Sequence, residues 1–61
     1  MDPIAAEAVL RAVEQAGVAG LCLEGRIEIG VQEARRHCPD LDDEALVVLV
    51  RALLAEEANH R

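Results

Sequence analysis

The segment ALVVLVRALLAEE, residues 45–57, carries one charge in its first eleven positions. On a helical wheel its large side chains form a broad apolar arc that is wide enough to pack against two neighbouring helices. A second apolar stripe lies behind that arc and consists of Ala45, Val48, Ala52 and Ala55. Only Glu44 and Arg51 interrupt the far side. A helix that is apolar on almost every side is normally buried on more than one face, so this chain must either leave part of the helix in water or cover it with another molecule.

The small size of the chain favours the second outcome, in which another molecule covers the exposed side of this helix. With 61 residues it forms one domain, and a domain of this size buries only about 60% of the surface that its unfolded chain exposes. Aromatic residues are absent, so the core has to be built from Leu, Val, Ile and Ala. Oligomerisation is a common remedy for a core that is too small to stand alone. Isolated alanines and a valine on a helix surface are nevertheless ordinary, and that plainer interpretation stays open.

A helix start is encoded by Asp2 followed by Pro3. Asp is a preferred N-cap acceptor, and proline is tolerated at the first helical position because its missing N–H has no intrahelical partner there. The apolar residues that follow recur at helical spacing and form one stripe: Ala6, Val9, Leu10, Val13 and Ala16. Gly17 has the residue type that commonly follows a helix end. We therefore expect a helix over about residues 3–16.

Residues 21–31 fit two patterns. At helical spacing one face would hold Leu23, Ile27, Val31, Ala34 and Cys38. At a period of two, Ile27, Ile29 and Val31 alternate with Arg26, Glu28 and Gly30, which leaves open a hairpin turning at Glu24-Gly25. A lone two-stranded ribbon is marginal in water and no third strand is available. We favour a helix over about residues 24–37 that ends before Pro39, because cations at positions 35–37 suit a helix C-terminus.

The third helix is expected over about residues 43–58. Asp42 can cap its first turn, and Asp43 and Glu44 complement the positive end of its dipole. The second segment carries a modest basic patch made of Arg26, Arg35, Arg36 and His37. This patch either remains a solvated surface, salt-bridges to the acidic start of the third helix across the Pro39 turn, or faces an acidic partner.

No motif for catalysis, cofactor binding or metal binding is present in the sequence. The soft-ligand candidates are Cys22, His37, Cys38 and His60, but they lack the short paired spacing of structural zinc sites. Ser and Thr are absent, so no serine triad can form, and the glycines do not have the spacing of a phosphate loop. We expect no enzyme activity, no cofactor and no metal.

Composition narrows the class of partner. The chain contains no Lys and its net charge is −6, which disfavours nucleic acid because phosphate binding depends on clustered basic residues. No apolar run approaches the ~20 residues that span a bilayer, so we expect no membrane contact. With two cysteines and no secretory signal pattern at the N-terminus, we expect a cytoplasmic protein with reduced thiols. Arginine without lysine and abundant alanine suggest a GC-rich bacterial genome.

The sequence therefore predicts an all-α, small three-helix domain over residues 1–61 that assembles as a helical homodimer. Its function is predicted to be that of a non-enzymatic protein-interaction module, a self-associating regulator or accessory subunit that binds itself or another protein through the apolar third helix. The candidate partner-binding residues are Val47, Val48, Arg51, Ala52 and Ala55. An alternative is an acidic inhibitor or antitoxin-like protein that binds a basic partner surface.

Overall fold

The protein folds into three α-helices, shown by a computed structural model that describes residues 1–60. Helix α1 spans Pro3–Val18, α2 spans Leu23–His37 and α3 spans Asp43–Asn59. The all-α prediction is confirmed, and no strand is present in the part of the chain that the structure describes. The hairpin alternative at Glu24-Gly25 is wrong, because one continuous helix runs through it and buries residues that recur at helical spacing, Ile27, Gly30, Val31 and Ala34.

Helix α1 begins as its sequence predicts but ends later. The Asp2 carboxylate accepts a hydrogen bond from the backbone N–H of Ala5 at 2.9 Å, as an N-cap should. The prediction that Gly17 follows the helix end is wrong, because Gly17 lies inside α1. The residue in that role is Gly20, whose φ of +96° is a conformation that side chains rarely adopt.

The end of α1 is a Schellman motif. The backbone N–H of Gly20 donates to the Gly17 carbonyl, and that of Leu21 donates to the Ala16 carbonyl, both at 3.0 Å. These two bonds satisfy carbonyl groups that the last helical turn leaves without partners. The chain is thereby turned sharply into α2, which returns along α1.

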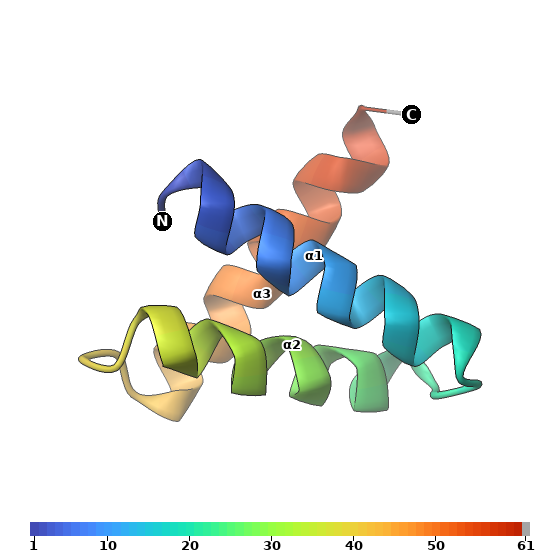
Figure 1. Ribbon diagram of the computed structural model, residues 1–61, viewed down its shortest axis with the longest axis horizontal. Helices are drawn as coiled ribbons and strands as arrows, with labels where there is room; N and C mark the ends of the chain where they lie inside the picture. Colours follow the sequence, from blue (N-terminus) through green and yellow to red (C-terminus); the bar gives the residue numbers. More distant parts are fainter. Residues whose placement is uncertain (61) are drawn as a thin grey trace.

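The core lies where the three helices cross. Helices α1 and α2 converge at the turn that joins them and splay apart toward the other end, while α3 crosses behind the pair (Figure 1). Helix α3 contacts α2 more extensively than α1. The core consists of Val9, Val13, Ile27, Val31, Ala34, Leu46 and Val50. The close approach of α1 and α3 to α2 depends on Gly30, because a Cβ at this position would lie 2.8 Å from Val13 Cγ2 and 2.9 Å from Val50 Cγ1.

The connection from α2 to α3 is held by polar contacts. The Asp42 carboxylate accepts a hydrogen bond from the Ala45 backbone N–H at 2.8 Å and caps α3. The Arg35 guanidinium donates to the Asp43 carboxylate, so α2 and α3 are joined by an ion pair across the Pro39 turn. Of the three alternatives for the basic patch, an ion pair with the acidic start of the third helix is present at Arg35. None of the helices described is long and apolar enough to cross a membrane.

Candidate interaction surface on α3

Helix α3 presents two different sides. Leu46 and Val50 point into the core and are fully buried at 0% exposure. On the opposite side Val48 is 64% exposed, and the small residues near it are also in water. We call this side the outer face, and it comprises Glu44, Val48, Arg51, Ala52 and Ala55. Beyond the crossing, the last turns of α3 extend past α1 (Figure 1), and residues 55–59 are exposed.

The outer face is exposed because two helices cannot surround a third. Helices α1 and α2 meet α3 on one side, where they take up Leu46 and Val50 and part of the surface of three further leucines, Leu49, Leu53 and Leu54. Nothing in the chain approaches the opposite side over residues 1–60. The result is a helix with a packed apolar side and an unpacked side that is also largely apolar.

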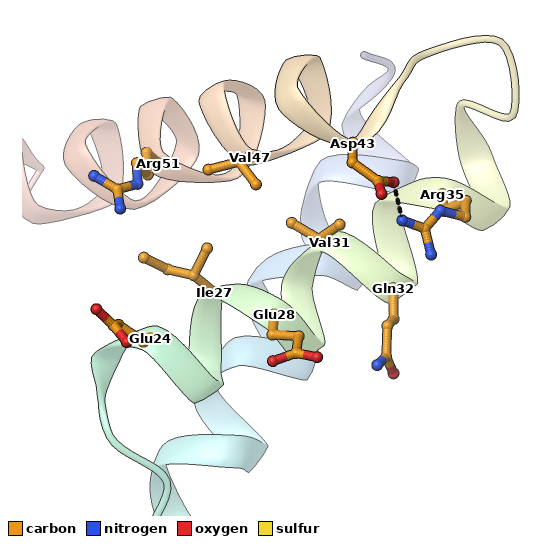
Figure 2. Close-up of a pocket in the computed structure, with 9 residues that line it drawn as sticks. All are labelled: Glu24, Ile27, Glu28, Val31, Gln32, Arg35, Asp43, Val47 and Arg51. Atoms are coloured by element: carbon orange, nitrogen blue, oxygen red, sulfur yellow. Dashed lines mark hydrogen bonds and ion pairs between the residues drawn. The ribbon is translucent and has the colours of Figure 1, made fainter.

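A groove between α2 and α3 borders the outer face. It has a volume of about 370 Å³, and its apolar surface comes from Ile27, Val31 and Val47. Figure 2 shows these three side chains in the space between the two helices, with Glu28 and Gln32 along the α2 rim. Val47 is only partly buried, so the floor of the groove is accessible from outside.

Charges of both signs mark the two ends of this groove. Glu24 and Arg51 lie at one end, and the Arg35–Asp43 ion pair closes the other end (Figure 2). Asp43 is therefore already paired, whereas Glu44, the next residue along the chain, forms no ion pair within residues 1–60. Within residues 1–60, neither Glu44 nor Arg51 has an opposite charge within 4.0 Å.

The structure divides the five residues that the sequence indicated for partner binding. Val47 lines the groove, and Arg51 lies on both the groove rim and the outer face. Val48, Ala52 and Ala55 are exposed on the outer face alone. All five therefore belong to one continuous surface, but not all are equally accessible.

Sequence reasoning missed the contribution of α2 to this surface. Ile27 and Val31 form the second wall of the groove, and Glu24 and Glu28 form its acidic rim. The signal was present as two rows at helical spacing, an apolar row and an acidic row directly beside it. What the sequence does not show is which side of α2 lies next to α3, because that depends on how the helices cross.

The cysteines and histidines are kept apart by the fold. Cys22 and Cys38 flank opposite ends of α2, about 24 Å apart along the helix axis, which is too far for a disulfide within one chain. The His37 ring hydrogen-bonds to Glu33 at 3.1 Å, and His60 lies at the far end of α3. Across residues 1–60 no group of three His, Cys, Asp or Glu side chains is arranged to hold a metal ion.

Within residues 1–60, the outer face and the groove beside it offer methyl groups, the guanidinium of Arg51 and the carboxylates of Glu24, Glu28 and Glu44, none of which forms an ion pair. These groups suit contact with another helix, where small side chains allow the two axes to approach to about 8–10 Å. No protein-family model matches this chain, and neither a curated protein nor a solved structure is detectably similar to it.

Proposed function

We propose that this chain is a small non-enzymatic protein-interaction module that self-associates into a homodimer through the outer face of α3. Such a module would serve as a self-associating regulator or as an accessory subunit of a larger assembly. The observation that carries the proposal is the exposure of Val48 at 64%, with Ala52 and Ala55 beside it on the same unpacked side of an otherwise apolar helix.

The free energy of unfolding of so small a fold is low. A domain of 61 residues has an unfolding free energy of about 3–9 kcal/mol. Fully burying one valine is worth about 1.5–3 kcal/mol relative to leaving it in water. Covering the 64% of Val48 that is exposed is therefore worth about 1–2 kcal/mol on each of two copies, before the entropic cost of association is subtracted. Two-fold contacts are the commonest way for identical chains to assemble.

The small size of the chain limits the affinity that we expect for the homodimer. A standard protein interface covers about 800 Å² on each partner, which is about a fifth of the 4392 Å² surface of this chain. One helix face and the adjacent groove rim form a smaller contact than that. We therefore expect a reversible dimer with a dissociation constant in the micromolar range.

The test is the oligomeric state of the isolated protein over a wide range of concentration, measured by sedimentation equilibrium or light scattering. We expect a concentration-dependent rise from 6.6 kDa toward twice that mass. Val48→Arg should abolish the rise, since it places two cations against one another at the contact. Val18→Arg is the matched control, because Val18 is 86% exposed at the end of α1 and the substitution is the same.

A monomer that persists at high micromolar concentration would overturn the homodimer. Equal behaviour of the Val48→Arg and Val18→Arg variants would show that the contact does not use α3. In either case the alternative, an acidic inhibitor of a basic protein, gains weight from Glu24 and Glu28, which are exposed on α2 with no opposite charge within 4.0 Å in the described chain. Binding of that kind would weaken steeply as salt is added.

A further inference from the structure

The two free charges on the outer face of α3 have opposite signs and lie at either side of Val48. Glu44 and Arg51 are seven residues apart, which is two helical turns or about 10.5 Å. Their midpoint falls between Val47 and Val48. Both side chains are exposed, and neither has an intrachain ion pair among residues 1–60. Along this face a negative and a positive charge therefore flank Val48, and the exposed Ala52 and Ala55 follow Arg51.

We propose that two copies of this chain pack with their α3 helices antiparallel, about a two-fold axis beside Val48, so that Glu44 of each copy pairs with Arg51 of the other. This inference rests on the proposed self-association and adds its orientation and the residues that determine it. Only an antiparallel arrangement makes the pattern self-complementary. A parallel arrangement would place Glu44 against Glu44 and Arg51 against Arg51, and like charges that face each other repel.

The groove carries charges near both ends of this contact, and its Arg51 end also holds Glu24, so Arg51 would face two carboxylates, Glu24 of its own chain and Glu44 of the second copy. Arg51 lies at the Glu24 end and Asp43 at the opposite end (Figure 2). A second α3 laid antiparallel to the first brings its own Glu44 to the Arg51 end. Its Val48 then lies over Val47 at the mouth of the groove, where the apolar walls are accessible. At the other end Arg35 already neutralises Asp43, so Glu44 is the carboxylate left to meet Arg51 of the second copy.

The decisive variant is Glu44→Arg, because the local and the overall electrostatic effects then have opposite signs. The net charge changes from −6 to −4, which lowers the general repulsion between two copies and by itself favours association. The proposed contact instead turns two attractive pairs into two repulsive ones. We expect the dissociation constant to rise about tenfold.

Glu14→Arg is the matched control for this variant. Glu14 is exposed on α1, outside both the outer face and the groove between α2 and α3, and its replacement gives the same net charge of −4. We expect Glu14→Arg to dimerise at least as tightly as the unmodified protein. Far-UV circular dichroism on each variant checks that the helices are intact, because Glu44 also favours the first turn of α3 through the helix dipole.

Exchange of the charges completes the test. Arg51→Glu alone should weaken association, as Glu44→Arg does. The chain that carries both changes should recover to within about threefold of the original affinity, since its pairs are again opposite in sign. An equimolar mixture of the two single variants should form a heterodimer tighter than either homodimer, because both of its pairs are attractive.

The possible results distinguish a failure of the antiparallel pairing from a failure of self-association itself. If the unmodified protein stays monomeric, the self-association fails and the orientation fails with it. If the protein dimerises and Val48→Arg prevents this, but Glu44→Arg behaves like Glu14→Arg, the contact uses α3 and the antiparallel pairing is wrong. A double variant or a mixture that fails to recover, with its helices intact, also overturns the pairing.

Discussion

Gly30→Ala tests whether the three-helix crossing is as tight as its geometry indicates. The added Cβ would lie 2.8 Å from Val13 Cγ2 and 2.9 Å from Val50 Cγ1, whereas ordinary contact begins at 3.4 Å. Val13 and Val50 are both buried and β-branched, so neither can rotate away easily. Overpacking of a filled core costs about 1–3 kcal/mol, while replacing a helical glycine by alanine returns about 0.5–1 kcal/mol. The difference between these ranges is about 0–2.5 kcal/mol, and because both contacts would be shorter than 3.0 Å we expect a net loss of about 1–2 kcal/mol.

Gly25→Ala provides the control from the same helix. Its Cβ would lie 3.2 Å from Leu21 Cδ2, but that leucine is 39% exposed and its side chain can move into solvent. Gly25 lies in the first turn of α2, so only part of the helix-propensity gain applies, and this variant should be more stable than the original by up to about 0.5 kcal/mol. The same substitution, five residues apart, is thus expected to change stability in opposite directions.

Thermal and urea unfolding followed by far-UV circular dichroism measure both variants, because the chain has no aromatic residue to report by fluorescence. For a domain of this size, each kcal/mol moves the melting temperature by about 4–8 °C. All chains are compared at one concentration, since self-association adds apparent stability. Gly30→Ala as stable as Gly25→Ala would refute the reasoning. Combining Gly30→Ala with Val13→Ala should cost less than the sum of the two single changes.

Three further predictions concern the helix ends. Gly20→Ala should lower the unfolding free energy by about 1 kcal/mol in a urea titration, because an alanine is strained at φ +96°. Asp42→Ala should lower it by about 1 kcal/mol as well, since the N–H of Ala45 loses its 2.8 Å acceptor; Asp42→Asn should retain most of the stability. Replacing Cys22 and Cys38 together by Ala should preserve the helical spectrum, and elemental analysis of the unmodified protein should find no stoichiometric zinc.

The helices themselves were readable from the sequence because their signals are local. The Asp2-Pro3 start, the Asp42 cap and the apolar stripe through Val9 and Val13 each depend on residues within a few positions of one another. The end of α1 was placed too early, because two glycines could have terminated it. Gly17 continues the helix and leaves room for the Arg26 side chain, because a Cβ at this position would lie 3.1 Å from Arg26 Cδ. The left-handed residue is Gly20.

Part of the candidate interaction surface was also predictable, because its signal is local to one helix. That one side of residues 45–57 would remain uncovered follows from composition and helical periodicity alone. The groove was not predictable, since it depends on α3 crossing α2 at Gly30 and so placing Val47 opposite Ile27. A crossing point is a property of two elements together, and neither helix encodes it in its own period.

Gly30 also connects the core to the proposed contact. Because Gly30 has no side chain, Val13 of α1 and Val50 of α3 can both pack against α2 at this position. A small set of buried residues is then enough to form the core. The core therefore uses one side of α3 and leaves Val48 free on the other. The two sides should be energetically separable. Gly30→Ala should weaken the monomer, whereas Val48→Arg should leave the unfolding of the dilute monomer within about 0.5 kcal/mol and remove only its dependence on concentration.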